Sequence, residues 1–395
     1  MSESSGTALK IAIIAGEASG DSLGASLIET LAARHIKLSL LGVGGTRLEG
    51  RGLRSLFPQS DIAVMGIAAV LQRLPLLMRR INETAQAVAA AAPDLLLTID
   101  SPDFTLRVAR KVRAIAPQIP IVHWVCPSVW AWRPWRARRM APHVDLVLCL
   151  LPFEPDELRK LNGPRGIYIG HPLIERIADL RPQSSRDREA RANANAPEIL
   201  LLPGSRKSEA KHLLRLFGEA AARFAAGAPR AQFILPAVEH LREMIESAVM
   251  AWPTRARIVT GDEAKLAAFR RARAAVAASG TVTLELALAG VPTVAVYRVA
   301  EWEAVIARRM IRVPSVLLPN LILGRNIMPE LLQEDCTAAK IVERLAPLAA
   351  ETVERASQLE AFAEIERRMK PSDLPPSARA GDEIMKMLTE RREPR

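Results

Sequence analysis

The chain has 395 residues, of which 49% are hydrophobic and 25% charged, and its formal net charge is +11. This composition is typical of a globular protein and excludes a disordered or fibrous chain, while the length predicts two domains. The positive charge favours anionic partners, but nucleic acid, lipid headgroups and phosphorylated metabolites all qualify. The cysteines, Cys126, Cys149 and Cys336, include no C-x-x-C pair, so neither a disulfide framework nor a zinc cluster is supported and a reducing cytoplasm is favoured.

The N-terminal residues lack the basic region and apolar core of a signal peptide, so export is not expected. No stretch of about 18 uninterrupted apolar residues occurs, which argues against a membrane-spanning helix. Any contact with a membrane is expected to be peripheral.

Short apolar runs alternate with helical patterns in the first half of the chain. The runs predicted as strands are 10–15, 38–43, 94–99, 121–125 and 144–150, and a helical pattern covers 23–33. Strands separated by helices indicate β-α-β units and a mostly parallel sheet. Residues 174–197 are charged and poor in large apolar side chains, as an interdomain linker or a surface helix would be.

The alternation restarts beyond this segment, with strands predicted at 198–202, 231–236, 257–260, 274–278 and 291–297. We therefore expect an α/β protein with two Rossmann-like, doubly wound parallel-sheet domains, at 1–175 and 190–350. Residues 351–395 are expected to form helices that pack back on the first domain or on a partner subunit. Open α/β sheets bind ligands at the carboxyl ends of their strands, so we expect the site in a cleft between the domains.

A glycine-containing loop, Gly16-Glu17-Ala18-Ser19-Gly20-Asp21, follows the first predicted strand and opens a helix, where backbone N–H groups favour anions. Its order is not G-x-G-x-x-G, which disfavours a nicotinamide or flavin site. A plain structural turn with a helix cap explains the loop equally well.

Two carboxylates follow the strand at 94–99. Asp100 is a candidate acceptor for a hydroxyl proton at the edge of the sheet. Asp103 has a simpler explanation, because it could cap a helix whose first turn holds Pro102.

Two loops of the second half are candidates for binding phosphate. In Gly204-Ser205-Arg206 the guanidinium could bind a diphosphate, although a solvated arginine is as good an explanation. In Ser279-Gly280-Thr281 small residues would let phosphate approach a helix N-terminus, and Glu285 could accept the ribose hydroxyls. The alternative for that loop is an ordinary helix-capping arrangement.

Several other classes of site lose support. No H-E-x-x-H or other close ligand pair occurs among the histidines, so a metal site is disfavoured, and His171-Pro172 is interpreted as structural. Neither a G-x-S-x-G elbow nor a Walker sequence is present, which disfavours a hydrolase or an ATPase.

Residues 64–80 combine large apolar side chains with arginines, as a segment lying in a headgroup layer or holding an acyl chain would. A buried helix with a basic end is the commoner alternative, and Pro75 predicts that a helix here is bent or broken. The residues proposed for membrane or acyl contact are Val64, Met65, Ile67, Val70, Leu71 and Leu74.

Tryptophans and arginines are concentrated at 124–139, namely Trp124, Trp130, Trp132, Trp135, Arg133, Arg136, Arg138 and Arg139. Such a cluster suits lipid headgroups or ordinary packing. It could also stack on single-stranded nucleic acid, but no recognition-module signature accompanies it. We therefore expect no nucleic-acid partner. Because of the basic charge, a nucleic-acid-binding module remains the alternative to an enzyme.

Taken in chain order, short segments spread over nearly the whole sequence resemble those of the lipid-A-disaccharide synthase family. They are AGEASGD (15–21), AVMGI (63–67), IDSPDF (99–104), PSVWAWR (127–133), LPFE (151–154), IGHP (169–172), LPGSR (202–206), ASGT (278–281), LPNL (318–321) and ELLQEDC (330–336). The family consists of inverting glycosyltransferases with the two-domain GT-B architecture. The rival enzymes are other GT-B proteins that use unacylated UDP-sugars, such as a cell-wall glycosyltransferase or a UDP-sugar epimerase.

The resemblance implies transfer of 2,3-diacylglucosamine from UDP-2,3-diacylglucosamine to the 6-hydroxyl of 2,3-diacylglucosamine 1-phosphate (lipid X), giving a β-1,6 disaccharide and UDP without a metal or cofactor. It assigns the base-like carboxylate to Asp100 and the nucleotide side to Arg206, Glu285 and Asn320. The loop with Glu17, Ser19 and Asp21 would face the reacting sugars, and the segment around Met65 would hold acyl chains or membrane. A homodimer with exchanged C-terminal segments, peripheral on the anionic inner face of the bacterial inner membrane, is also implied.

The sequence departs from the family pattern in a few places. Ser101 stands where the family often has Ala, Thr105 where Asn is frequent and Cys126 where Ser is common. A histidine that many relatives have at residue 23 or 24 is missing, so it is not essential to the chemistry here.

Overall fold

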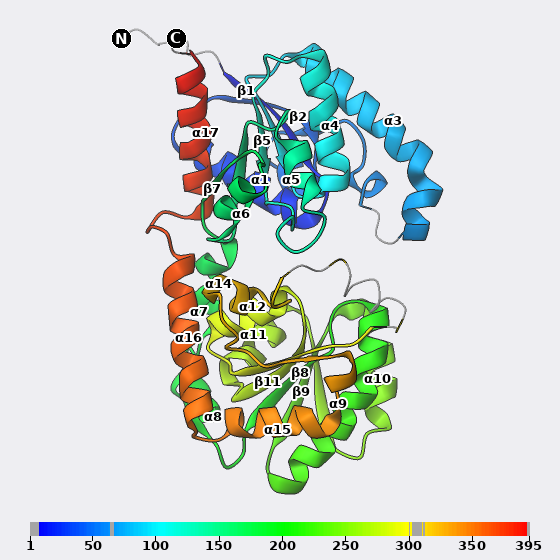
Figure 1. Ribbon diagram of the computed structural model, residues 1–395, viewed down its shortest axis with the longest axis vertical. Coiled ribbons are helices and arrows are strands. Elements are labelled where there is room, and N and C mark those ends of the chain that lie inside the picture. The colour runs from blue at the N-terminus through cyan, green and yellow to red at the C-terminus, as the bar shows by residue number, and fades with distance from the viewer. Residues whose placement is uncertain (1–7, 64–66, 300, 302–309, 311–312, 393–395) are drawn as a thin grey trace. The chain divides into compact units, whose positions relative to one another are not determined.

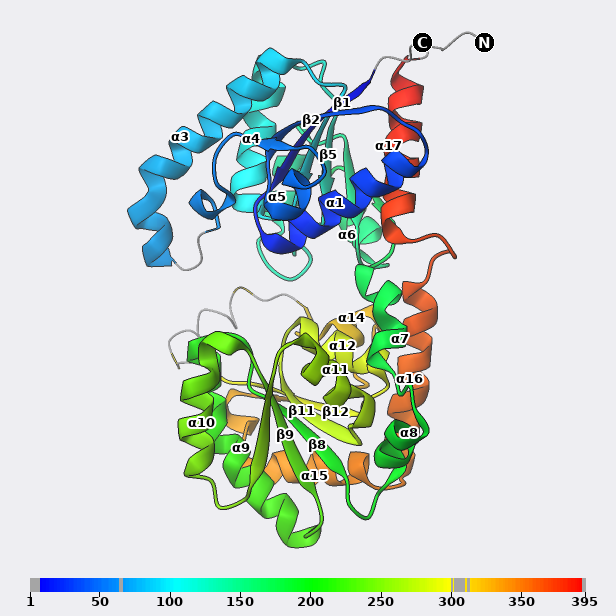
Figure 2. The same ribbon diagram turned by 180° about the vertical axis from the view of Figure 1, so that it is seen from behind.

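The computed structural model describes residues 8–63, 67–299, 301, 310 and 313–392. The chain forms two compact α/β units, shown from opposite sides in Figures 1 and 2. Unit 1 comprises 1–171 together with 371–395, and unit 2 comprises 172–370. The chain therefore returns to unit 1 at its C-terminal end.

Unit 1 is built on a seven-stranded sheet in the order β3-β2-β1-β4-β5-β6-β7, in which every pairing is parallel. Its strands are β1 (Leu9–Ala15), β2 (Leu38–Val43), β3 (Arg54–Ser55), β4 (Leu95–Ile99), β5 (Ile121–Trp124), β6 (Leu146–Cys149) and β7 (Arg165–Tyr168). The central strands β4, β5 and β6 are buried along their whole length. Such strands need mainly apolar residues on both faces, which explains why most of their residues are apolar.

Helices cover both faces of this sheet. They are α1 (Ala18–Ala33), α2 (Thr46–Glu49), α3 (Ile67–Ala91), α4 (Pro102–Ile115), α5 (Trp135–Met140), α6 (Glu154–Lys160) and α17 (Pro376–Arg392), with a 3-10 turn η1 (Gln59–Asp61). One core cluster joins the sheet to α1 and α17, and a second joins it to α3 and α4. The helix α3 continues through Pro75, so of the two expectations for this position, a bent or a broken helix, the broken helix is wrong.

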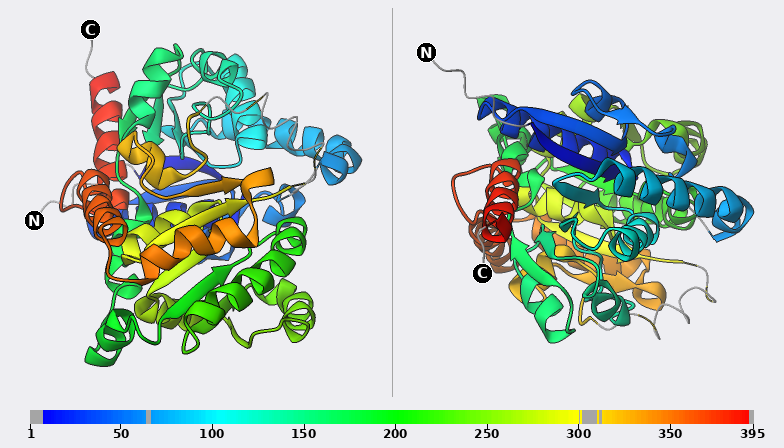
Figure 3. Two further views of the ribbon diagram at one scale, coloured as in Figure 1. Left: turned by 60° about the horizontal axis from the view of Figure 1, so that its bottom comes forward. Right: turned by 90° about the horizontal axis from the view of Figure 1, so that it is seen from above.

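Unit 2 has a six-stranded parallel sheet in the order β10-β9-β8-β11-β12-β13. Its strands are β8 (Glu198–Leu202), β9 (Gln232–Ala237), β10 (Ala256–Thr260), β11 (Ala274–Ala278), β12 (Thr293–Tyr297) and β13 (Glu330–Leu332). Its helices are α7 (Ile177–Leu180), α8 (Ser185–Ala192), α9 (Lys207–Gly227), α10 (Arg242–Met250), α11 (Asp262–Arg271), α12 (Thr281–Ala289), α14 (Leu318–Leu323), α15 (Ala338–Ala349) and α16 (Val353–Met369), with 3-10 turns η2 (Pro172–Arg176), η3 (Glu239–Leu241) and η4 (Gln333–Asp335). Figure 3 shows α15, in orange, lying against this sheet, where it contacts β11 and β12.

The polar segment 174–197 is a surface helical segment of unit 2, one of the two forms that its composition allowed. Ser184 and Asp187 form a reciprocal capping box at the start of α8. Arg181 donates to the Leu288 carbonyl at 3.0 Å and Arg191 to the Ala289 carbonyl at 2.6 Å. These arginines fasten α7 and α8 to the end of α12, a role that their charge alone does not predict.

The C-terminal helices divide between the units. Helix α16 packs on α12 and α14 in unit 2, whereas α17 packs on α1 in unit 1. Ile384 is fully buried in the same cluster as Leu27 and Leu31 of α1. An ion pair between Arg34 and Asp382 at 2.5 Å lies at the edge of this contact.

We predict that Ile384→Ala lowers the free energy of unfolding by about 2–5 kcal/mol, because it leaves a cavity between α17 and α1. Lys386→Ala, on the exposed side of the same helix, is the matched control and should change it by about 0.5 kcal/mol or less. Urea denaturation followed by circular dichroism measures both. Equal stability of the two variants would contradict the packing of α17 described here.

Candidate functional site

The loops that follow β1 and β4 meet at the carboxyl edge of the unit 1 sheet. The two strands are neighbours in register, with Ala15 paired to Ile99. A Cβ atom on Gly16 would overlap the hydroxyl of Ser101, so only glycine fits at this position. The Ser101 hydroxyl donates to the Glu17 carboxylate at 3.3 Å. The topology thus brings Glu17 and the Asp100 loop together at this edge of the sheet.

Asp100 lies in a strained turn directly after β4. Its φ is 54° and that of Ser101 is 43°, both in the left-handed region that residues other than glycine rarely adopt. Thr105 stabilises the turn, because its buried hydroxyl donates to the Asp100 carbonyl at 2.7 Å and to the Ser101 carbonyl at 3.0 Å. The sequence identified Thr105 only as a departure from the family pattern. Its position one turn into α4 could have indicated this supporting role.

The Asp100 carboxylate has one oxygen engaged. Its Oδ1 accepts the Ser101 N–H at 2.8 Å, and the strand bond from the Asp100 N–H to the Trp124 carbonyl measures 3.0 Å. Within the described part of the chain, Oδ2 has no hydrogen-bond partner. The half-buried carboxylate is therefore oriented at one oxygen and free to accept a proton at the other.

Asp103 does not cap α4, so the simpler of its two explanations is wrong. The N-cap position is Ser101, and Asp103 lies in the first turn after Pro102. Its carboxylate is 72% exposed and forms an ion pair with Arg136 at 2.5 Å. Asp103 thus links the Asp100 loop to α5.

Asp21 and Ser19 have different surroundings. Asp21 is buried, and its carboxylate accepts the backbone N–H groups of Gly45, Arg47 and Leu48 at 2.7, 3.0 and 3.2 Å. Asp21 therefore fixes the start of α2. Ser19, in contrast, is exposed. A hollow of about 660 Å³ lies beside these loops, lined in part by Asp21, Gly45 and Gln59.

In unit 2, Arg206 is presented at the start of α9. Gly204 has φ 95°, and a Cβ atom there would lie 2.7 Å from the carboxylate of Glu209, which reaches back over the turn. That carboxylate pairs with the Arg206 guanidinium at 2.8 Å. Ser205 is exposed, and its carbonyl lies 3.1 Å from the His240 ring. The Arg206 side chain is 70% exposed, so its remaining donors face solvent.

The turn Ser279-Gly280-Thr281 follows β11 and opens α12. Gly280 is the N-cap residue and no side chain caps the helix, so the capping interpretation is wrong for this turn. Glu285, one turn further, forms an ion pair with Lys265. Both line an enclosed space of about 20 Å³, which has room for about one water molecule.

Asn320 is in the interior of unit 2. Its side-chain N–H₂ donates to the Met328 carbonyl at 3.0 Å and to the Glu330 carboxylate at 2.8 Å. Its oxygen accepts the Ile327 and Met328 N–H groups, both at 3.0 Å. The amide therefore fastens the chain that leads into β13, and a direct contact with a nucleotide would require these bonds to break.

One group of potential metal ligands is found among the described residues. Side-chain atoms of Cys126, Cys149 and Glu154 lie within 4.8 Å of one another, and all three residues are buried. Glu154 accepts hydrogen bonds from the Leu150 and Leu151 N–H groups and from the Trp130 indole, while burial raises the pKa of its carboxyl to about 7. Because those donors already occupy both oxygens, the group fixes the start of α6.

The segment proposed to contact acyl chains or membrane is only partly described. Val64 and Met65 lie outside the described residues, and of Ile67, Val70 and Leu71 only the helical backbone is described. Leu74 is 41% exposed and Met78 is also exposed. In the described parts of the chain, every helix is too short or too polar to cross a bilayer.

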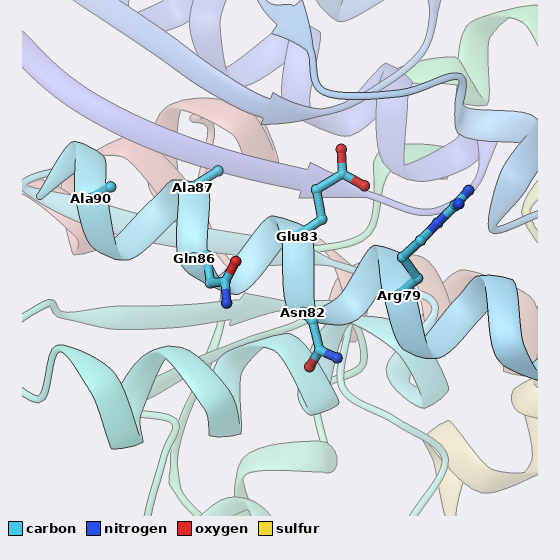
Figure 4. A pocket seen from close by; sticks show the side chains of 6 residues that line it. All are labelled: Arg79, Asn82, Glu83, Gln86, Ala87 and Ala90. Atoms are coloured by element: carbon cyan, nitrogen blue, oxygen red, sulfur yellow. The ribbon is translucent and has the colours of Figure 1, made fainter.

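Further along α3 the surface is hollowed by about 820 Å³ beside Arg79, Asn82, Glu83, Gln86, Ala87 and Ala90. Figure 4 shows that Asn82 and Glu83 point to opposite sides of the helix. Because these polar groups do not converge on a common centre, this surface is not a candidate binding site.

The tryptophan and arginine cluster divides into two parts. Trp124 is fully buried in β5, and Trp130 packs edge-on against Phe153. Trp132 and Trp135 are exposed, and Arg133 and Arg139 stack on their rings at 4.1 and 4.5 Å. Packing explains the first pair, and the second pair forms a basic aromatic surface.

Solved structures of two kinds share this fold. The chain matches a calicheamicin glycosyltransferase with a TM-score of 0.62 at 16% identity, covering 98% of this chain and all of that one. It matches a UDP-GlcNAc 2-epimerase from Neisseria meningitidis bound to UDP-GlcNAc with a TM-score of 0.58 at 13% identity, covering 96% and 100%. The fold is therefore that of GT-B glycosyltransferases and related epimerases.

The sequence matches a family model described as lipid-A-disaccharide synthetase over residues 11–374. A lipid-A-disaccharide synthase from Rhodopseudomonas palustris (strain HaA2) is 51% identical over 97% of both chains. One from Rhodospirillum centenum (strain ATCC 51521 / SW) is 41% identical over 97% of this chain and 96% of its own. The chain belongs to the lipid-A-disaccharide synthase family and is a glycosyltransferase.

We predict that Asp21→Ala lowers the free energy of unfolding by about 1–3 kcal/mol, because three backbone N–H groups lose their acceptor. Ser19→Ala, at an exposed position on the same helix, serves as the control and should have almost no effect. Thermal and urea unfolding of both variants measure the difference. If the two variants were equally stable, Asp21 would not have the supporting role assigned to it.

Proposed function

We propose that the chain transfers 2,3-diacylglucosamine from UDP-2,3-diacylglucosamine to the 6-hydroxyl of 2,3-diacylglucosamine 1-phosphate (lipid X), forming the β-1,6 disaccharide and UDP. Membership of the lipid-A-disaccharide synthase family supports the reaction class and both substrates. The observation that carries the proposed mechanism is the strained loop after β4, which holds Asp100 with one oxygen fixed and the other free.

Asp100 is proposed to orient and deprotonate the acceptor hydroxyl. Attack on the anomeric carbon requires that the hydroxyl oxygen lose its proton as the new bond forms. A carboxylate that is already fixed by the Ser101 N–H and by the backbone contacts of Thr105 needs little reorganisation to accept it. Glu17, bonded to Ser101, and Asp103, bonded to Arg136, are proposed to shape the acceptor side of this loop.

The nucleotide is proposed to bind at the carboxyl edge of the unit 2 sheet. As the glycosidic bond to UDP breaks, negative charge grows on the diphosphate, and cations or helix N-termini directed at it lower the barrier. Arg206 and the uncapped start of α12 at Ser279, Gly280 and Thr281 supply these two elements. Gly204 and Ser205 form the turn that presents Arg206, while Glu285 and Asn320 are proposed to complete the nucleotide side, Asn320 by holding its loop.

The setting is proposed to be a membrane surface, because both substrates carry acyl chains. The exposed apolar residues Leu74 and Met78 of α3 and the net charge of +11 support peripheral contact with an anionic bilayer. We propose the inner face of the bacterial inner membrane as the location and a homodimer as the assembly, both from the family resemblance.

We predict that Asp100→Asn lowers kcat by about 100- to 10,000-fold, because an amide accepts a proton poorly. Binding of UDP should be retained, since the change lies in unit 1. Asp156→Asn, an exposed carboxylate of α6, is the control and should be fully active. Undiminished turnover of Asp100→Asn, or failure of the variant to fold, would contradict the assignment.

Arg206→Ala should raise the KM for the UDP donor and lower kcat/KM by about 10- to 100-fold, because a charge-assisted contact to the diphosphate is lost. Arg215→Ala removes the same charge from an exposed position on the same helix and should leave the kinetics unchanged. Steady-state rates at varied donor concentration measure KM and kcat/KM for both variants. Matching kinetics for both variants would remove Arg206 from the site.

A further inference from the structure

A basic hollow of about 510 Å³ lies between α4 and α5 in unit 1. Its wall includes Asp103, Arg107, Arg110, Trp135, Arg136 and Arg139. The sequence drew attention to the tryptophans and arginines at 124–139, but it gave no reason to add Arg107 and Arg110. Those two arginines belong to α4, whose side chains line the hollow together with those of α5.

Most of the arginines in this wall have no carboxylate partner. Arg136 pairs with Asp103, whereas Arg139 stacks on Trp135 at 4.5 Å. Arg107 contacts the sulfur of Met78 at 3.9 Å. Throughout the described part of the chain, no carboxylate forms an ion pair with Arg107, Arg110 or Arg139. Uncompensated guanidinium groups around a hollow make a site for an anion, and their forked donors match phosphate oxygens.

A neighbouring histidine responds to the same positive charge. His143 lines the hollow and is half-buried. Burial lowers the pKa of its imidazole below the ordinary value, and the charges of Arg110 and Arg113 lower it further. The histidine is therefore neutral near pH 7, and the arginines supply the positive charge of the hollow.

The hollow begins immediately beside the proposed catalytic loop. Pro102 and Asp103, which belong to its wall, follow Asp100 within the same turn. Leu106, Trp135 and Met140 add an apolar wall next to the arginines. A ligand that occupied this hollow while presenting a hydroxyl to Asp100 would combine an anionic group with a sugar or acyl surface.

We propose that this hollow binds the phosphate monoester of the acceptor glycolipid, with Arg107 and Arg110 as its principal contacts. The proposal rests on the function proposed above, because it takes the hydroxyl of the same molecule to be at Asp100. The bound phosphate would select the phosphorylated acceptor and set which of its hydroxyls reaches the carboxylate. A phospholipid headgroup offers related chemistry, so the test separates the two sources.

The experiment compares the double variant Arg107→Gln/Arg110→Gln, both on α4, with Lys111→Gln/Arg138→Gln, which removes the same charge from positions on α4 and α5 outside the hollow. Each protein is assayed with the UDP donor and either 2,3-diacylglucosamine 1-phosphate or 2,3-diacylglucosamine lacking the phosphate. The wild type and the control should prefer the phosphorylated acceptor in kcat/KM by about 10- to 100-fold. The Arg107/Arg110 variant should lose most of this preference through a higher KM, with kcat nearly unchanged.

Equal use of both acceptors by the wild type, or an unchanged preference in the Arg107/Arg110 variant, would overturn the proposal. Vesicles of phosphatidylglycerol in phosphatidylcholine provide the second measurement. Loss of vesicle binding with the acceptor preference intact would assign the hollow to bilayer headgroups instead and so overturn the acceptor assignment. If the wild type formed no disaccharide, the proposed function itself would be contradicted. That outcome differs from a wild type that is active but uses both acceptors equally, which would contradict only the phosphate site.

Discussion

Both units depend on one constraint: a fully parallel sheet must be covered by other elements on both of its faces. The backbone is then accessible to a ligand only at the ends of the strands. Helices occupy the two faces of the unit 1 sheet, as the buried clusters around α1 and α17 and around α3 and α4 show. Loops after neighbouring strands therefore meet at the carboxyl edge, however far apart they lie in sequence. The contact between Gly16 and Ser101 follows from this constraint, because these residues begin the loops that leave the adjacent strands β1 and β4. The candidate catalytic and binding groups lie at this edge, because the faces of the sheet are covered by helices.

The proposed catalytic loop is strained, and its surroundings hold it in place. Asp100 and Ser101 are both left-handed, a conformation that persists only where neighbouring contacts enforce it. The strand bond to Trp124 and the hydroxyl of Thr105 fix the backbone on either side of the carboxylate. Unit 2 achieves a similar result with less strain, since Gly204 takes the positive φ and Glu209 braces Arg206. A rigid carboxylate and an exposed cation suit the proton transfer and the nucleotide binding that are proposed for them.

Much of this arrangement could be predicted from the sequence, and the rest depends on contacts between distant residues. The buried strands were placed within a few residues because nearly all of their residues are apolar, as in β4 and β11. The short strands β3, β7 and β13 carry too few apolar residues to be recognised. Asp100 was singled out from its place after a strand, and the structure leaves it available. The partners of Asp103 and Asp21 are remote in sequence, so neither the ion pair to Arg136 nor the burial of Asp21 could be predicted.

The central claim is that the nucleotide binds at the strand ends of unit 2, while the acceptor is activated at those of unit 1. Hydrogen–deuterium exchange of the full chain with and without saturating UDP tests it most directly. The account predicts slower exchange at 204–208 and 279–285, with no change at 16–20 and 99–105. Protection confined to the loops of unit 1, or none in unit 2 when calorimetry shows that UDP is bound, would contradict it.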